Sequence, residues 1–393
     1  MKSILITLLL FTSFISAQEN RFTLPSQKNS MGELSFMVDD PLSDAFLYAS
    51  KIGLSDGNTV FFAPGYNPTK DIDEANQYKN EHDYNVTQIP IGIMLGKHTF
   101  KLGIVAGFYQ IKGQYNLTIP GESYQSIDYS KSRPIQIITG YVFNDFSIGA
   151  GYYNSYKEME FQGLKYQEIM VGAGTKIDGS NNIYFDYSHK RIGQYFIKSI
   201  NSYRIEYKNN LSKQLVAGLL ASVHTVNYLV PLSKYYSAAA GIVYNFDKWQ
   251  FAGELCYEHN IFKPANGEFR DYFRIQENDL INMDFFFGSP SEETANNWKT
   301  KLGMKYSFSD NLDFTSGVIY CYNNSTRHSD ISPNPFNLTI NDFGITAGIN
   351  YKYSCFSFVY NFAYHYAKER GNALSPNIHF TSLNHLFLVS YNF

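Results

Sequence analysis

Apolar and polar residues alternate one by one through most of the chain. In Trp249–Glu258, every second residue is large and apolar apart from Gly253, and the intervening positions include Gln250, Glu254 and Glu258. The same rhythm runs through Phe100–Tyr109, Tyr203–Lys208 and Lys301–Phe308. A period of two places successive side chains on opposite faces of a β-strand. The pattern therefore predicts an all-β protein, although a water-soluble sandwich would show the same alternation.

The connections between the predicted strands alternate in length. The short ones are rich in Asn, Asp, Gly and Ser, as tight turns require; they are Gly96–Thr99, Asn144–Asp145, Asp178–Asn182, Asn209–Lys213, Asn245–Lys248, Ser309–Asn311 and Lys352–Ser354. The longer, more polar ones are about Gly113–Lys131, Met159–Lys165, Lys190–Lys198, Leu229–Lys234, Phe262–Asn297, Asn323–Thr339 and Glu369–Ile378. Outer-membrane barrels have short periplasmic turns and longer outer loops. We therefore expect a closed antiparallel transmembrane β-barrel.

The same alternation gives a strand count. Fifteen strands can be counted between Tyr84 and Phe393, and a barrel with both ends in the periplasm needs one more. Asn58–Tyr66 is the candidate for it, with Asn67–Asp83 as its outer loop. The prediction is sixteen strands. Fourteen and eighteen remain alternatives, because the stretch that contains Asp284–Phe287 could form an outer hairpin instead of wall.

The last strand, Leu383–Phe393, carries a further signal. Phe387, Val389, Tyr391 and Phe393 share one face, and Asn384, Ser390 and Asn392 lie on the other. In this it resembles the outer-membrane β-barrel superfamily, whose members often end in Phe preceded by apolar residues at every second position. The resemblance implies that the barrel-assembly machinery recognises this strand and that it pairs with the first strand. Such closure is required, since each unpaired backbone amide costs several kcal/mol in hydrocarbon.

The chain divides into three predicted parts, at residues 1–17, 18–57 and 58–393. The first has the three regions of a secretory signal peptide: Lys2, the apolar run Ile4–Ile15, and small residues before Gln18. That run is too short to span a bilayer comfortably, and no later stretch of about 18 apolar residues exists. We therefore expect export through a cleaved signal peptide to the outer membrane of a Gram-negative bacterium.

Residues 18–57 precede the first predicted strand and form either a periplasmic tail or a plug inside the barrel. Within them, Pro41–Asp56 resembles the small N-terminal hatch of the fatty-acid transporter family of outer-membrane barrels. Tyr48-Ala49-Ser50 stands where that family often has Asn-Pro-Ala. The resemblance implies a hatch inside the barrel and the movement of hydrophobic molecules.

The polar face of the strands is expected to line the interior if the aromatic face meets lipid. Both signs of charge are present on it, which is consistent with a hydrated pore, and sixteen strands leave an aqueous channel unless something fills it. An alternative is a network of ion pairs that fills the interior. The candidate pore-lining residues are Asp186, Arg204, Glu206, Lys208, Glu254, Glu258, Lys299, Lys301 and Lys305.

Composition narrows the function further. The chain has 33 Tyr and 32 Phe but only 17% charged residues, as expected of a protein whose main partner is lipid. A net charge of −3 argues against nucleic acid. Three widely spaced cysteines fit neither a disulfide framework nor a metal site, and no catalytic or cofactor motif is present. Ser188, His189 and His385 lack a visible third catalytic partner.

Two functions remain at this point. The first is a passive channel or transporter for small solutes, or for a hydrophobic substrate. The second is a structural or interaction barrel that binds an unidentified protein through its N-terminal segment or its outer loops, with Phe262–Asn297 as the longest of these loops. Neither function needs a cofactor or an enzymatic step.

Overall fold

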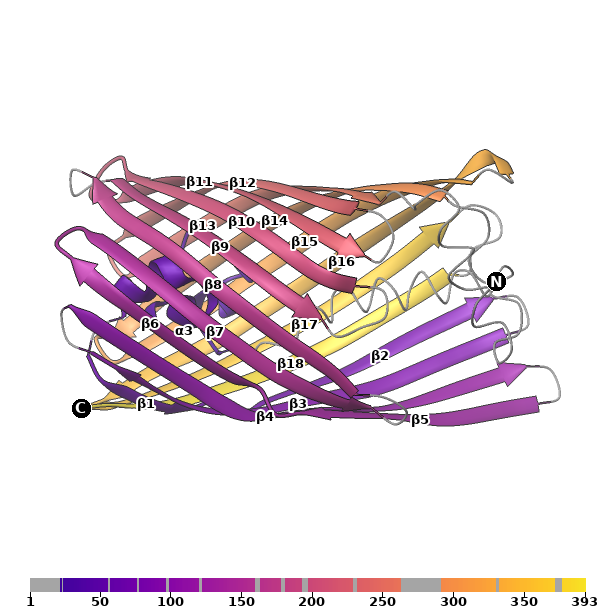
Figure 1. Cartoon of the computed structure of the whole chain (residues 1–393), viewed down its shortest axis with the longest axis horizontal. Coiled ribbons are helices and arrows are strands. Elements are labelled where there is room, and N and C mark those ends of the chain that lie inside the picture. The colour runs from indigo at the N-terminus through magenta and orange to yellow at the C-terminus, as the bar shows by residue number, and fades with distance from the viewer. Residues whose placement is uncertain are drawn as a thin grey trace.

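The computed structural model describes residues 22, 24–55, 57–75, 78–96, 99–119, 122–159, 163–177, 181–192, 197–228, 232–262, 291–329, 332–371 and 377–393. In these residues the chain is a barrel of long tilted strands with a short helical segment in its interior (Figure 1). The helical elements are α2 (Gln27–Ser30), α3 (Pro41–Leu47) and the 3₁₀ helix η1 (Ala49–Leu54). None of the described helices is long and apolar enough to cross a membrane.

The wall is a single antiparallel sheet. Its segments are β1 (Thr59–Phe62), β2 (Gly65–Ala75), β3 (Tyr78–Leu95), β4 (Phe100–Ile119), β5 (Glu122–Ser132), β6 (Ile135–Phe143), β7 (Phe146–Met159), β8 (Gly163–Ile177), β9 (Asn181–Ile192), β10 (Ile197–Asn210), β11 (Leu215–Tyr228), β12 (Leu232–Phe246), β13 (Trp249–Phe262), β14 (Ser291–Ser309), β15 (Leu312–Ser329), β16 (Ser332–Tyr353), β17 (Phe356–Gly371) and β18 (Asn377–Asn392). Neighbours in sequence are neighbours in the sheet, and β18 returns to β1 and β2 to close it.

Sixteen wall strands result from these eighteen described segments. β1 and β2 both lie between β18 and β3, and β5 and β6 both lie between β4 and β7, so each pair is one strand. Each break falls at a proline, Pro64 or Pro134, which has no N–H to donate to the ladder. The register is the same on both sides of each break. The predictions of a closed sixteen-stranded barrel and of a first strand near Asn58–Tyr66 are therefore confirmed.

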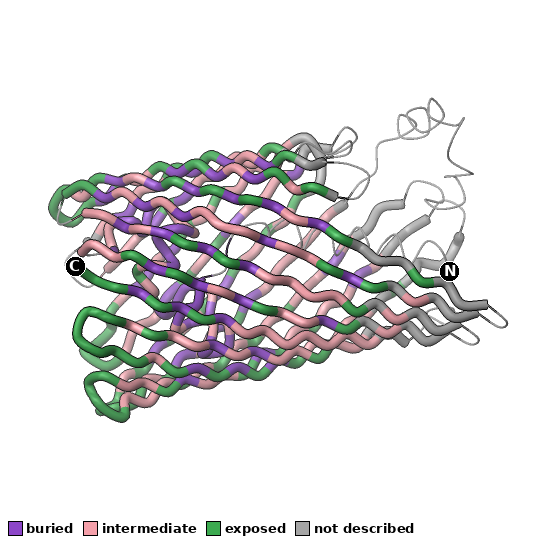
Figure 2. The backbone as a smooth tube through the Cα atoms, turned by 90° about the horizontal axis from the view of Figure 1, so that it is seen from below, coloured by how far each residue is buried: buried purple, intermediate pink, exposed green. Residues whose placement is uncertain are grey.

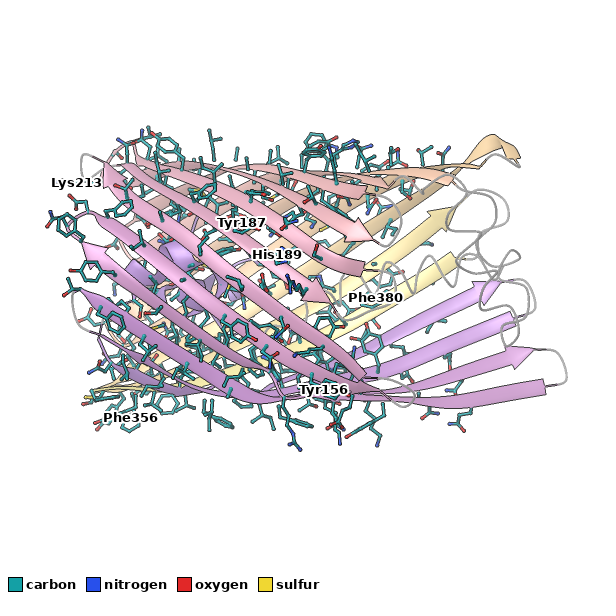
Figure 3. All side chains as sticks on the ribbon, in the orientation of Figure 1. Tyr156, Tyr187, His189, Lys213, Phe356 and Phe380 are labelled. Atoms are coloured by element: carbon teal, nitrogen blue, oxygen red, sulfur yellow. The ribbon has the colours of Figure 1, made fainter. Side chains whose placement is uncertain are left out.

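The outward face has the layering of a membrane protein. On β14 the outward positions include Tyr306, Met304, Leu302 and Trp298, so Met304 and Leu302 lie between aromatic side chains. Other strands repeat this order, with Tyr244 and Tyr236 on either side of Ile242, and Tyr351 and Phe343 on either side of Ile349 and Ile345. Side chains cover the outside of the wall (Figure 3). An apolar band with aromatic girdles at both edges is what lipid requires.

The connections between strands agree only in part with the prediction from sequence. The short turns that lie within the described residues are confirmed: Asn144, Asp247 and Ser354, for example, each adopt a positive φ between two strands. Most of the predicted turn Asp178–Asn182 and the middle of Gly96–Thr99 lie outside the described residues. The longer polar connections are mostly strand instead. Asn67–Asp83, expected as a loop, pairs within β2 and β3 up to Ala75 and Tyr78, and similar extensions occur in β4, β5, β15 and β16.

The physical reason is length. β4 has 20 residues and β16 has 22, whereas about 9–11 tilted residues span a bilayer. The extra residues stand in water on both faces, so they lose the apolar alternation while keeping the backbone ladder. Most of the predicted loop Phe262–Asn297, including Asp284–Phe287, lies outside the described residues; its last part, from Ser291, belongs to β14.

The final strand closes the wall as expected. Val60 and Phe62 of β1 pair with Tyr391 and Val389 of β18, and the Phe393 N–H donates to the carbonyl of Asn58. Phe387, Val389, Tyr391 and Phe393 are exposed outward, while Ser390 is buried inward. Inward-facing Leu386 and Leu388 are buried as well, because the interior of the barrel at this level is occupied.

Candidate functional site

Residues 24–55 lie inside the barrel at the end that carries the short turns. Figure 1 shows α3 enclosed by the wall near the C-terminus, and Figure 2 shows buried backbone concentrated at that end. α3 begins at Pro41 after the N-cap Asp40, whose carboxylate accepts from the Ser43 N–H at 3.0 Å. We refer to residues 24–55 as the lumenal segment.

Two apolar clusters fix the lumenal segment to the wall. In the first, Phe46, Ala49 and Ile52 pack with inward residues such as Ile138 and Leu388. In the second, Met31, Phe36 and Met37 pack against Ala239, Val243 and Cys256. Fully burying a side chain of the size of Phe or Ile stabilises by roughly 1.5–3 kcal/mol. The interior at this end is therefore a packed core instead of an open pore.

Wall glycines allow this close packing. A Cβ placed on Gly303 or Gly317 would collide with the backbone of Met31 or Gly32, and a Cβ on Gly149 would collide with the Ala49 carbonyl. Gly172 and Gly174 make room for Ser50 in the same way. A glycine in a strand often marks such an approach of another backbone segment.

A buried cluster of charges joins the lumenal segment to β9 and β10. Lys51 Nζ lies 2.8 Å from Glu206 Oε1, 3.0 Å from Asp39 Oδ1 and 3.7 Å from Asp44 Oδ2, and its side chain is 0% exposed. Lys208 Nζ lies 2.6 Å from the same Asp39 oxygen. Four cations face four carboxylates, so the cluster is neutral; its members are Lys28, Lys51, Arg204 and Lys208 with Asp39, Asp44, Asp186 and Glu206.

Aromatic rings and backbone groups complete this charge cluster. The Arg204 guanidinium carbon stands 3.9 Å from the centre of the Tyr48 ring. Lys51 Nζ stands 5.1 Å from the centre of the Tyr184 ring, within cation–π range. Asp186 accepts from both the backbone N–H and the hydroxyl of Ser50, at 2.8 and 2.6 Å.

A second set of polar contacts holds the segment on the opposite side. Glu254 on β13 accepts three backbone N–H groups, from Ser35 at 2.6 Å, Phe36 at 2.9 Å and Met37 at 2.8 Å. Lys301 on β14 donates to the Glu33 carbonyl at 2.6 Å and to the Ser35 hydroxyl at 2.7 Å. A carboxylate that receives three N–H groups fixes the path of the chain as well as neutralising its own charge.

Threonine and amide side chains extend these contacts around the wall. The Thr346 hydroxyl accepts from the Gly32 N–H and donates to the Ser30 carbonyl, both at 2.8 Å. Asn361 Nδ2 donates to the Ser26 carbonyl at 2.7 Å, and Gln136 Nε2 donates to the Phe46 carbonyl at 2.5 Å. Backbone polar groups that a short segment leaves unpaired are thus satisfied by the inward face.

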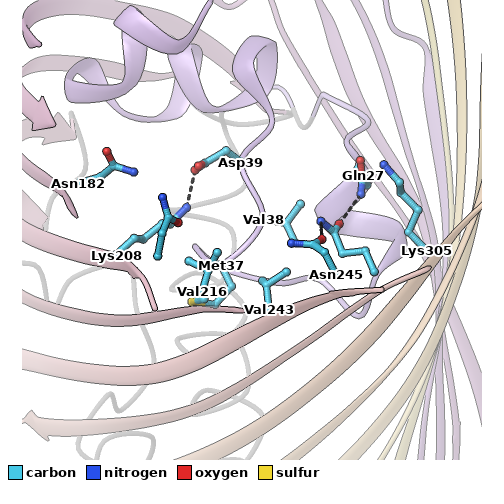
Figure 4. Close-up of a pocket in the computed structure, with 12 residues that line it drawn as sticks. Gln27, Met37, Val38, Asp39, Asn182, Lys208, Val216, Val243, Asn245 and Lys305 are labelled. Atoms are coloured by element: carbon cyan, nitrogen blue, oxygen red, sulfur yellow. Dashed lines mark hydrogen bonds and ion pairs between the residues drawn. The ribbon is translucent and has the colours of Figure 1, made fainter. Parts of the chain in front are cut away.

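A cavity of about 250 Å³ lies between the lumenal segment and the wall near the short turns (Figure 4). Met37, Val38, Val216 and Val243 form its apolar part. The polar residues that line it are Gln27, Asp39, Asn182, Lys208, Asn210, Asn245, Gln250 and Lys305. Within the described residues, no group of three or more His, Cys, Asp or Glu side chains could hold a metal ion.

The nine predicted pore-lining residues divide into two groups. Asp186, Arg204, Glu206, Lys208, Glu254 and Lys301 contact the lumenal segment. The others do something else: Lys299 pairs with Glu258 at 2.7 Å, and Lys305 lines the cavity and lies 3.7 Å from Asp313. Their role in lining a conducting pore remains a proposal.

No direct sign of the contacting residues on the lumenal segment is present in the sequence. Lys28, Asp39, Asp44 and Lys51 stand out only as charges in a short apolar stretch, and Thr315, Thr346 and Asn361 only as polar residues at inward positions. Matching one set to the other requires the three-dimensional path of residues 24–55.

The segment's own carboxyl groups have different proton affinities. Burial would raise the pKa of Asp39, but the ammonium groups of Lys51 and Lys208 outweigh it and hold that pKa well below its ordinary value. Burial, and then the nearby Asp44 carboxylate, raise the pKa of Asp40 from 3.8 to about 6.

This difference predicts a pH dependence for docking of the segment. A carboxyl group with a higher pKa in the docked state binds its proton more readily there, so docking strengthens as the pH falls from about 7 through 6. The low pKa of Asp39 acts in the opposite direction, but only below its ordinary titration range. We therefore expect hydrogen-exchange protection of the α3 amides to increase between pH 7 and pH 5.

The variant Asp40→Asn tests the assignment. Asparagine keeps an N-cap acceptor but cannot titrate. Protection factors for α3 should change less between pH 7 and pH 5 in this variant than in the parent protein. His365, whose Nε2 lies 3.1 Å from Glu33, is present in both proteins, so the difference between them isolates Asp40. If the pH dependence of α3 protection were the same in the variant as in the parent, another group would be responsible for it.

Comparison with known proteins identifies the class. No protein-family profile matches the sequence, and no curated protein matches it significantly. Among solved structures, a TodX monoaromatic hydrocarbon channel (deltaS2S3 mutant) has 11% identity over 93% of this chain and 98% of its own, with a TM-score of 0.53. The deltaS2 mutant of that channel has 11% identity over 94% and 98%, with a TM-score of 0.52.

A Pseudomonas aeruginosa FadL homologue has 10% identity over 95% of this chain and 99% of its own, with a TM-score of 0.50. The chain thus has the fold of an outer-membrane β-barrel, as its sequence pattern predicts. Its resemblance to the fatty-acid transporter barrels is confirmed at the level of the fold.

Proposed function

We propose that this chain is a transport barrel of the outer membrane and that the lumenal segment is its closure. One observation carries the proposal: residues 24–55 occupy the lumen. They are not part of the sheet, and side-chain and backbone contacts to its inward face hold them there. If residues 24–55 served only to stabilise the barrel, they would not need to be a separate segment that docks through buried ion pairs.

The solute passes along the barrel axis in this proposal. The register is unchanged across the breaks at Pro64 and Pro134, and every described strand is paired on both sides. This supports a route along the barrel axis and not a route through an opening in the wall. The substrates proposed are small solutes, including hydrophobic ones. Two of the similar structures are described as monoaromatic hydrocarbon channels, which is consistent with this choice.

Location and assembly follow from the same proposal. Residues 1–17 are removed as a signal peptide during export, and the barrel-assembly machinery recognises Phe387, Val389, Tyr391 and Phe393. The short turns and the lumenal segment then face the periplasm. The chain performs no chemistry and needs no cofactor.

A reversible crosslink between segment and wall tests the closure. A Cβ on Gly53 would lie 2.9 Å from the Ser147 Cβ, somewhat closer than the mean of about 3.8 Å in disulfides, so Gly53→Cys with Ser147→Cys needs less than about 1 Å of relaxation. Both changes are made in a background with Cys256, Cys321 and Cys355 replaced by alanine.

We expect the oxidised protein to show background conductance in planar bilayers and no swelling of proteoliposomes in a small sugar. Reduction should restore both to the level of the cysteine-free parent. Equal flux before and after reduction would exclude the segment as the closure. Absence of flux in all forms, with one protein co-purifying in stoichiometric amount, would favour the interaction barrel instead.

A further inference from the structure

Five basic side chains gather on the outward face of β4 to β9, at the edge of the apolar band farther from the short turns. They are Lys112, Lys131, Arg133, Lys165 and Arg191, and we call them the basic patch. Alternation fixes their direction. Tyr129 of β5 and Ile169 of β8 share the face of Lys131 and Lys165 and are exposed, whereas Ser132 and Tyr166, on the opposite face of the same two strands, are buried.

The strand register brings these side chains together. Lys112 pairs with Tyr129, and Lys131 stands between Gln110 and Glu158. Arg133 follows two residues after Lys131 on the same face. On the other side of β7, Lys165 pairs with Tyr156, and Arg191 pairs with Gln167, two residues after Lys165. Neighbouring strands are about 4.8 Å apart, so the patch spans about 19 Å.

Charge in the basic patch is poorly compensated. Two acidic residues border it on the outward face of the described strands: Glu158, which pairs with Lys131 at 2.8 Å in an exposed position, and Asp83 on β3, which lies diagonally from Lys112, two residues from its partner Asn85. Five cations and two carboxylates leave a net charge of +3. The outward face of β2 and β3 differs, because there Lys70 lies between Glu81 and Asp83, at 3.9 and 4.0 Å.

The depth of the basic patch in the membrane follows from its neighbours. Directly below it, toward the short turns, the outward face carries Tyr152, Ile135, Ile137 and Ile169. Tyr156, exposed beside Arg133 and Lys165, projects from the outside of the wall (Figure 3). Long basic side chains at such an edge keep their stems on apolar surface and their charges in the headgroup region. With the short turns in the periplasm, this region belongs to the outer leaflet.

We propose that the basic patch binds a phosphorylated lipid headgroup of the outer leaflet. Guanidinium forks on Arg133 and Arg191 suit bidentate phosphate contacts, and the three ammonium groups supply point charges around them. Lipid is the occupant that fits, because the charges border a surface already covered by acyl chains. The site is separate from the lumen, and it forms whether or not the barrel transports a solute.

Native mass spectrometry of the full chain in non-ionic detergent tests the site, with bis-phosphorylated lipid A as probe and the same lipid without phosphates as comparison. The test variant is Arg133→Gln/Lys165→Gln/Arg191→Gln. The matched control, Lys70→Gln/Lys234→Gln/Lys368→Gln, removes three outward basic residues elsewhere. Circular dichroism confirms that each variant remains a barrel.

The test variant should bind the phosphorylated lipid about a hundredfold more weakly, since each basic group at a charged membrane surface contributes roughly fivefold in affinity. The control variant should bind as the parent does, and the phosphate-free lipid should bind weakly to all three proteins. Equal loss in both variants would show non-specific charge attraction and overturn the proposal. Displacement of the lipid by millimolar inorganic phosphate would show a simple anion site, which also contradicts it.

Discussion

Replacing Lys51 by methionine is expected to release the lumenal segment from the wall. Methionine keeps most of the volume but removes the charge that Glu206, Asp39 and Asp44 share. Removing one partner of a buried ion pair typically costs about 3–5 kcal/mol, because the other partner stays buried without compensation. Since about 1.4 kcal/mol is a factor of ten, the undocked population should rise by roughly two to four orders of magnitude.

Two measurements detect the release of the lumenal segment. Hydrogen exchange at the amides of α3 and η1 should accelerate, and planar-bilayer conductance should increase. The control is Lys70→Met, which removes a half-exposed lysine whose ion pairs are worth about 0–1 kcal/mol and should change neither quantity. In Lys51→Met/Glu206→Gln the charges that remain in the cluster balance again, so part of the protection should return. Parental protection in the Lys51→Met protein would refute the anchoring role of the charge cluster.

Replacing Leu302 by lysine is expected to destabilise the barrel in a bilayer by about 2–4 kcal/mol, the cost of a lysine on the lipid face near the midplane. Leu302 is half exposed and lies midway between Trp298 and Tyr306 on β14. In a water-soluble sheet the same exposed position would accept lysine with almost no loss. Reversible urea unfolding from lipid vesicles measures the difference in the free energy of unfolding.

Two controls separate lipid exposure from other effects. Leu302→Met conserves volume and polarity and should cost less than about 1.5 kcal/mol. Asn260→Lys adds the same charge on the inward face of β13 and should change stability by no more than about 0.5 kcal/mol. If Leu302→Lys and Asn260→Lys were equally tolerated, the outward band would not lie in hydrocarbon.

The inward face of this barrel serves two structural purposes with one alternating pattern. Toward the short turns, polar side chains such as Asp186 and Glu254 bind the lumenal segment. Farther from the short turns, Glu258 of β13 and Lys299 of β14 pair with each other. Both sets look alike in sequence, since each is a charged residue between two outward apolar ones. What distinguishes them is only whether residues 24–55 reach that level.

The repeating pattern of the sequence determined the wall. Lipid on one side and a polar interior on the other impose a period of two, so the faces of Trp249–Glu258 and Lys301–Phe308, the short turns and the sixteen strands could be predicted locally. The same reasoning failed for Asn67–Asp83 and Gly113–Lys131. Above the bilayer both faces of a strand meet water, and alternation disappears although the ladder continues.

Only the tertiary structure decided what occupies the barrel. Lys51 and Glu206 are far apart in sequence, and neither has a local signature of the other. Their contact depends on closure of the wall and on glycines such as Gly149 and Gly317 that let a second backbone approach. Local patterning records which solvent each face of a strand meets, whereas a buried ion pair between distant segments exists only once the whole chain has folded around it.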